Sequence, residues 1–112
     1  MRFVRTLNNL LAGVAMLWAV NTTAVDWYVD NAATGSRNGT SWANAWTNLN
    51  SVTGTSSGDT VYVSGGSTSK TYRDPFWTPP NGITMRIGQD SGHNGRAIFD
   101  SQGVNNAWIY GA

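Results

Sequence analysis

The chain has 112 residues, with 7 lysines and arginines against 6 aspartates, one histidine and no cysteine. This length suits one small domain or part of a larger one, and a net charge of +1 gives no electrostatic reason to expect nucleic acid or an anionic membrane as a partner. Without cysteine, a disulfide framework and a thiolate zinc site are both excluded. Glycine, asparagine, serine and threonine dominate the polar positions, which favours turns and argues against an all-helical protein.

Residues 1–24 have the pattern of a secretory signal peptide. Arg2 and Arg5 form a basic start, an apolar run follows over 10–20, and Ala24 ends a small-x-small exit. The apolar run is too short for a membrane span, which needs about 20 residues, and the basic start argues against a buried core helix. We therefore expect a secreted protein, and the lack of disulfides indicates a bacterial source.

The segment 25–58 is predicted to hold a short strand, a loop and a helix. Aromatic and β-branched residues predict the strand at 26–30, and glycine and asparagine predict the loop over 31–40. Over 41–52 the apolar residues recur every three or four positions, which predicts an amphipathic helix. Its apolar stripe comprises Trp42, Ala45, Trp46, Leu49 and Val52.

The segment 59–112 is predicted to contain only short strands joined by turns. Strands are expected at 60–63, 83–87, 97–100 and 107–110, with glycine, proline and asparagine between them. This spacing suits a small β-sandwich, or a coil that rises one rung in roughly 20 to 30 residues. Periodicity by itself leaves both architectures open.

A series of motifs favours the coil. They are YVD at 28–30, NGTSWANAW at 38–46, GDTVYV at 58–63, TYR at 71–73, ITMRIG at 83–88, AIFD at 97–100 and WIYG at 108–111. In this order they resemble the N-terminal entry of secreted right-handed parallel β-helix proteins of the pectate-lyase-like superfamily. The resemblance implies the first rungs of a parallel β-helix over 59–112, with Ser67–Lys70 inserted as a longer loop; the alternative is the β-sandwich.

The two ends of such a coil differ in how they are capped. The first rung would leave apolar side chains and unpaired backbone groups exposed, and we expect a capping helix to cover them with Trp42, Trp46 and Leu49. The other end stops on the strand at 107–110 without a cap. We therefore expect either the front part of a longer protein or a subunit that stacks, with this open edge pairing with further rungs or another chain.

The sequence motifs for phosphate binding, metal binding and catalysis are incomplete. The stretch 64–71 lacks the glycine before Lys70 that a phosphate loop requires, and 90–95 opens a loop whose twelfth position is Ser101 where calcium binding requires glutamate. His93 is the only histidine, so a histidine-pair metal site is excluded, and no Gly-x-Ser-x-Gly turn accompanies a serine–histidine–aspartate triad.

We assign no catalytic, metal or cofactor residue to this chain. Carboxylate pairs for glycoside hydrolysis would have to come from Asp59, Asp74, Asp90 and Asp100, of which Asp59 and Asp100 fit turns at strand ends. In the superfamily that the chain resembles, catalytic residues lie on later rungs, and calcium would enter only with a longer parent protein.

The candidate binding residues are aromatic. Tyr72, Phe76 and Trp77 lie in a proline-flanked loop, where they could stack on sugar rings or pack the loop onto the coil. The resemblance implies a secreted protein directed at extracellular polysaccharide, by binding or, with later rungs, by lyase or hydrolase activity. The alternatives are a non-catalytic cell-surface adhesive protein and a self-assembling structural protein.

Overall fold

The computed structural model describes residues 23–73 and 75–103. In these residues the chain is mainly β, as the predicted strand segments indicate, and its longest helix is a single 3-10 turn. The elements in chain order are β1 (Asp26–Val29), η1 (Leu49–Ser51), β2 (Thr60–Val63), β3 (Ser69–Arg73), β4 (Thr84–Ile87) and β5 (Arg96–Asp100). None of the described residues forms a helix long and apolar enough to cross a membrane.

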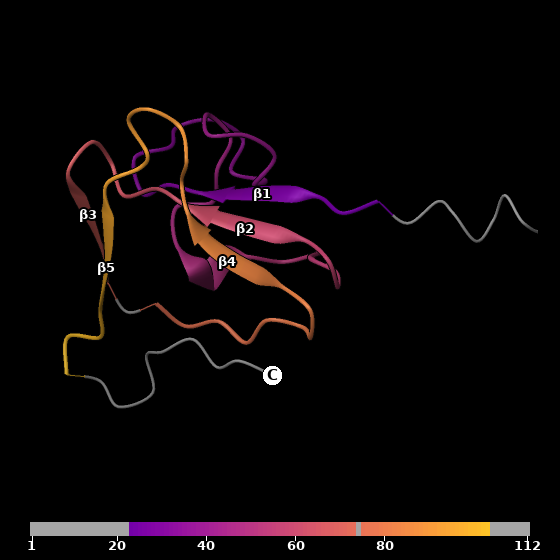
Figure 1. Ribbon diagram of the computed structural model, residues 1–112. Helices are drawn as coiled ribbons and strands as arrows, with labels where there is room; N and C mark the ends of the chain where they lie inside the picture. The colour runs from indigo at the N-terminus through magenta and orange to yellow at the C-terminus, as the bar shows by residue number, and fades with distance from the viewer. Residues whose placement is uncertain (1–22, 74, 104–112) are drawn as a thin grey trace, which may run out of the picture.

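The strands form two parallel sheets (Figure 1). One sheet has the order β1-β2-β4, and the other pairs β3 with β5. Thr60 at the start of β2 pairs with Thr84 of β4, and Ser69 at the start of β3 pairs with Arg96 of β5. All ladders among the described strands are parallel, whereas the sheets of a β-sandwich are antiparallel. This pairing argues against the β-sandwich alternative.

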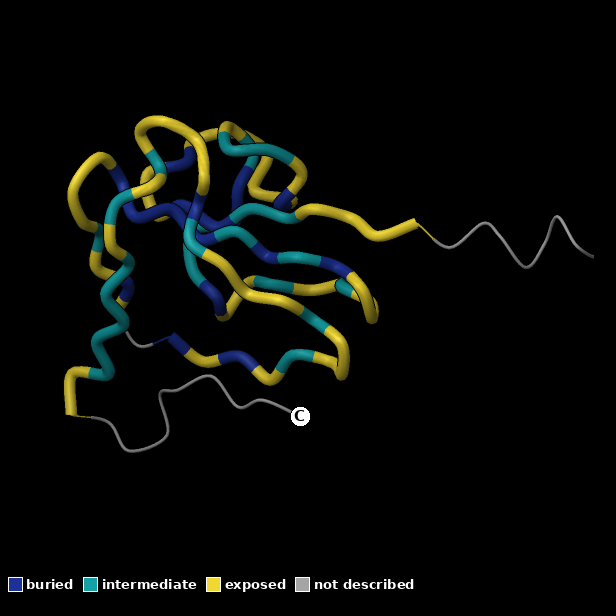
Figure 2. Tube along the Cα trace, in the orientation of Figure 1, coloured by how far each residue is buried: buried dark blue, intermediate teal, exposed yellow. Residues whose placement is uncertain are grey.

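The core forms where alternate side chains of β1 and β2 point inward. Val29, Val61 and Val63 are almost completely buried, while Tyr28 and Tyr62 between them stay partly exposed. Figure 2 shows the buried residues gathered at β1, β2 and the segment that joins them. The buried cluster consists of Val29, Trp46, Leu49, Val61, Val63, Tyr72 and Trp77.

The helix predicted over 41–52 is wrong. Bends and turns occupy 41–44 and 47–48, Trp46 forms a parallel bridge with Val29, and only η1 is helical. Asparagine side chains compete with helical hydrogen bonds: the Asn44 side chain accepts from the Ser36 N–H, and Asn48 caps η1 by accepting from the Leu49 N–H. The regular spacing of apolar residues in this segment therefore reflects which side chains pack on the core, and it does not indicate a helix.

Irregular backbone covers the free edge of β1. Tyr28 N–H donates to the Gly39 carbonyl, Trp46 N–H donates to the Tyr28 carbonyl, and Asp30 N–H donates to the Trp46 carbonyl, at 2.8 to 3.0 Å. These bonds cover the free edge of β1, and Trp46 and Leu49 pack on the core beneath it. Trp42 is the exception among the predicted capping residues, because it lies outside this core cluster.

The second sheet also differs from the sequence prediction. Ser67–Lys70, predicted as an inserted loop, contains the start of β3, where Ser69 and Lys70 pair with Arg96 and Ala97. The predicted strand at 97–100 is confirmed as β5. The predicted strand at 107–110, Asp74 and nearly all of the predicted signal peptide lie outside the described residues.

Candidate functional site

The aromatic residues predicted as a sugar platform do not form one. Tyr72 is 1% exposed and Trp77 is 6% exposed, and both belong to the core, so only Phe76 is open to solvent. Burial raises the pKa of the Tyr72 phenol well above its usual range, and the charge of Asp30 adds to the rise. A buried ring offers no face to a sugar, so the packing alternative describes Tyr72 and Trp77.

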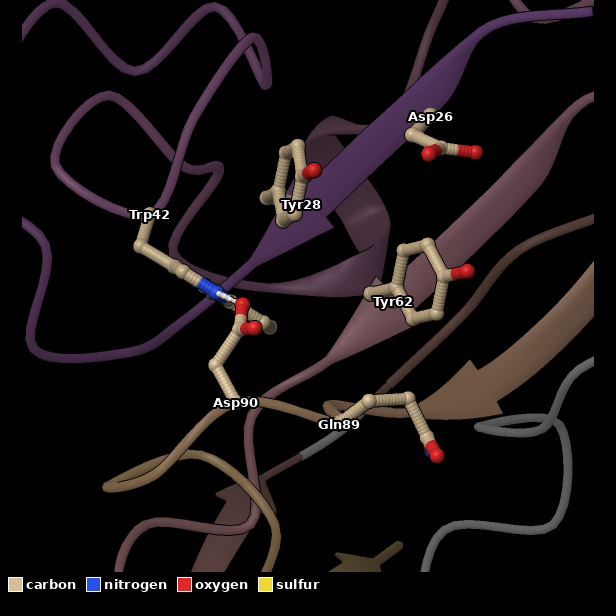
Figure 3. Close-up of a pocket in the computed structure, with 6 residues that line it drawn as sticks. All are labelled: Asp26, Tyr28, Trp42, Tyr62, Gln89 and Asp90. Atoms are coloured by element: carbon tan, nitrogen blue, oxygen red, sulfur yellow. Dashed lines mark hydrogen bonds between the residues drawn. The ribbon is translucent and has the colours of Figure 1, made fainter.

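A different aromatic cluster lies on the outer face of β1 and β2 (Figure 3). It lines a depression of about 190 Å³ that we call the aromatic pocket. The pocket is lined by Asp26, Tyr28, Trp42, Tyr62, Gln89 and Asp90. Three aromatic rings and three polar side chains thus meet in one place, although they come from four separate parts of the chain.

Strand register brings the two tyrosines together. Tyr28 of β1 and Tyr62 of β2 are direct partners in the parallel ladder, so both rings point outward from the same position. Their centroids are 5.8 Å apart with an interplanar angle of 23°, and the Trp42 indole meets Tyr28 edge-on at 4.8 Å. Figure 3 shows the two tyrosine rings between Trp42 and Asp26. The three rings form a continuous aromatic surface.

The turn after β4 holds Trp42 in place. The Trp42 indole N–H donates to Asp90 Oδ2 at 2.6 Å, and the indole lies parallel to the His93 imidazole with ring centroids 4.0 Å apart. Gly88 leaves room for the indole, since a Cβ at this position would lie 2.9 Å from a Trp42 ring carbon. Trp42 is therefore positioned before any ligand arrives, which lowers the entropy cost of binding.

The electrostatic character of the pocket is negative. Partial burial and the charges of Asp26 and Asp90 raise the pKa of the Tyr28 phenol above its ordinary value, with a further contribution from Tyr62. Both carboxylates are exposed at the pocket. The pocket therefore offers hydrogen-bond acceptors beside aromatic faces.

Ser64, His93 and Asp30 form a second cluster. This cluster contains the residue types of a catalytic triad but not its geometry. Ser64 Oγ lies 2.8 Å from His93 Nδ1, and Asp30 Oδ2 lies 3.6 Å from the same nitrogen. In a triad the serine and the carboxylate occupy opposite nitrogens of the imidazole. Ser64 is also completely buried, so its hydroxyl cannot reach a substrate.

This cluster connects strand ends. Asp30 follows β1, Ser64 follows β2, and His93 lies in the turn after β4. Lys70 Nζ donates to Asp30 Oδ1 at 2.5 Å, which joins β3 to the same network. We assign it a structural role, in which it fixes the turn that positions Trp42.

The other carboxylates are also engaged structurally. Asp59 accepts hydrogen bonds from the Trp27 indole and from the backbone N–H groups of Val25 and Ser56, which hold its pKa below the ordinary value. Asp100 pairs with Arg73 at 3.4 Å. Among residues 23–73 and 75–103 there is no cluster of three histidine, aspartate or glutamate side chains that could hold a metal ion.

Sequence reasoning overlooked the aromatic pocket, although one local signal was present. In Trp27-Tyr28-Val29 and Val61-Tyr62-Val63, strict alternation places each tyrosine on the face opposite the core. No local signal places Trp42 beside Asp90, because the two residues are far apart in the sequence. Comparison of the chain with family models, curated proteins and solved structures finds no match.

Proposed function

We propose that this chain forms the first rungs of a right-handed parallel β-helix in a secreted protein directed at extracellular polysaccharide, and that the aromatic pocket contacts the sugar. The parallel pairing of Thr60 with Thr84 and of Ser69 with Arg96 supports the coil, because short connections without helices suit a β-helix. The backbone segment that covers the free edge of β1 supports its placement at the first rung.

The aromatic pocket is the observation that carries the saccharide proposal. Aromatic faces pack against the C–H faces of sugar rings, and carboxylate and amide groups bind their hydroxyls. Tyr28, Tyr62 and Trp42 provide the faces, and Asp26 and Gln89 provide polar groups beside them. A volume of 190 Å³ is below the roughly 300–1,000 Å³ of drug-sized ligand sites. The pocket therefore suits one unit of a longer sugar chain.

We propose binding in preference to catalysis at this site. The two carboxylates at the pocket are accompanied by aromatic rings and an amide, and the Ser64–His93–Asp30 cluster lacks triad geometry. The Trp42 indole is already hydrogen-bonded to Asp90. A rigid aromatic surface of this kind recognises sugars without needing a reactive group.

Binding to oligosaccharides tests the saccharide proposal. Replacing Tyr62 or Trp42 with alanine is expected to weaken binding roughly 3- to 10-fold, since one aromatic contact is worth about 0.5–1.5 kcal/mol. Phe76→Ala is the matched control, because Phe76 is an exposed aromatic residue outside the pocket. Isothermal calorimetry measures the affinities. Equal affinity in all three variants and the unaltered chain would contradict the assignment of the pocket.

Cysteine cross-linking tests the coil, and the chain has no cysteine to interfere. If 107–110 continues the sheet with the same step that relates β2 to β4, Arg86 and Tyr110 become direct neighbours, within the Cα distance of a disulfide. The Arg86→Cys, Tyr110→Cys pair should oxidise readily, whereas Thr84→Cys with Tyr110→Cys should not. The reverse preference is expected of antiparallel pairing and would refute the β-helix proposal.

A further inference from the structure

The aromatic pocket has carboxylates but no lining cation. Asp26 and Asp90 are the only lining residues that carry a charge at neutral pH. Within the described residues, the Asp26 carboxylate forms no hydrogen bond or ion pair, and only Oδ2 of the Asp90 carboxylate is used, by the Trp42 indole. Figure 3 shows the two carboxylates on different sides of the tyrosine pair. Acceptors without cationic partners therefore flank the aromatic faces.

Nearby cations in the described part of the chain form no ion pair with the pocket carboxylates. As the ladder partner of Tyr62, Arg86 lies on the same face of the sheet, but within the described residues it does not line the pocket and forms no ion pair with Asp26 or Asp90. Lys70 is engaged by Asp30 in the network behind Trp42. Neither side chain lines the aromatic pocket, so neither neutralises its carboxylates by direct pairing.

We propose that the aromatic pocket selects amino-sugar units, with a protonated amine, over uronic acid units. This inference rests on the proposed saccharide-binding function and names the substrate class of that site. An ammonium group gains a charge-assisted hydrogen bond from Asp26 or the free oxygen of Asp90, and it is attracted to the electron-rich faces of the tyrosines and Trp42. The carboxylate of a uronic acid is repelled by the like charges of Asp26 and Asp90.

Three oligosaccharides of equal length test this selection. They are a glucosamine oligomer below the pKa of its amine, its N-acetylated neutral form, and a galacturonic acid oligomer. At low ionic strength we expect the amine form to bind roughly 3- to 10-fold more tightly than the neutral form, as for an exposed ion pair combined with an exposed cation–π contact. The galacturonic acid oligomer should bind most weakly. Salt at about 0.5 M should reduce these differences, because it screens exposed charges.

Two charge-removing variants locate the effect. Asp26→Asn and Asp90→Asn should each bring the affinity ratio between the amine and neutral oligomers closer to one. An asparagine at 90 can still accept the Trp42 hydrogen bond through its amide oxygen. Asp100→Asn is the matched control, because Asp100 lies on β5 beside Arg73 and outside the pocket. This variant should preserve the ratio.

The outcomes separate the two proposals. Equal binding of the amine and neutral oligomers, or preference for the galacturonic acid oligomer, overturns the charge selection and leaves saccharide binding in place. An unchanged ratio in both Asp26→Asn and Asp90→Asn also overturns it. Failure of all three oligomers to bind the unaltered chain overturns saccharide binding itself, and the selection with it.

Discussion

Replacing Tyr72 with phenylalanine removes one buried hydroxyl and tests whether this residue belongs to the core. The hydroxyl donates to the Ser64 carbonyl at 2.7 Å and lies 3.4 Å from the Val29 carbonyl, and Tyr72 is 1% exposed. A buried carbonyl that loses its donor costs about 1–3 kcal/mol. For a domain of about 60–100 residues, each kcal/mol lowers the melting temperature by about 4–8 °C. We therefore expect a fall of at least about 4 °C.

The assay is urea and thermal denaturation of the whole chain, followed by circular dichroism. Tyr62→Phe is the matched control, because its hydroxyl lies at the aromatic pocket and forms no hydrogen bond to the described residues. This control should unfold at the same midpoint as the unaltered protein. If Tyr72→Phe also leaves the midpoint unchanged but weakens sugar binding, the assignment of Tyr72 to the core is refuted and the sugar-platform interpretation returns.

Three further predictions concern stability. Trp46→Ala should cost about 3–5 kcal/mol in urea denaturation, since Trp46 is 4% exposed in the core; a loss below about 1 kcal/mol would contradict this packing. Gly65→Ala should lower the urea midpoint more than Gly54→Ala, because a Cβ at 65 would lie 2.2 Å from the Gly95 carbonyl carbon, whereas a Cβ at 54 meets no atom and adds only the strain of a φ of +77°; equal losses would exclude this close contact. The lowered pKa of Asp59 adds stability that is complete above its unfolded-state pKa, near 3.8, and is lost as pH falls through the folded-state value. Acid titration of stability should therefore be flatter in Asp59→Asn, and an unchanged profile would refute this linkage.

Local patterns in the sequence were sufficient for several strands and for much of the core. Alternation at Val61-Tyr62-Val63 places two valines inside and one tyrosine outside, and the structure has this arrangement in β2. Trp46 and Leu49 were also recognised as covering residues, because their size and apolarity favour burial in any backbone conformation. Composition excluded a helical protein for the same reason, since glycine, asparagine and serine favour turns.

The conformation of 41–52 required the tertiary structure. A spacing of three and four residues between apolar positions predicts which side chains are buried. It does not predict which backbone N–H and C=O groups form hydrogen bonds with each other. Trp46 bonds to Tyr28 and Asp30 along the edge of β1, and these partners become available only after the strand is placed. The free edge of β1 thus competes successfully with a helix that its asparagines support weakly.

The candidate site likewise depends on contacts that no local pattern encodes. Tyr28 and Tyr62 belong to strands that are distant in the sequence, and the parallel register stacks their rings. Trp42 reaches this pair because Asp90 and His93 hold its indole from a turn much further along the chain. Sequence alone therefore determined which residues prefer the interior and which segments extend. The tertiary structure decided which exposed rings meet, because ladder pairing and turn contacts join distant parts of the chain.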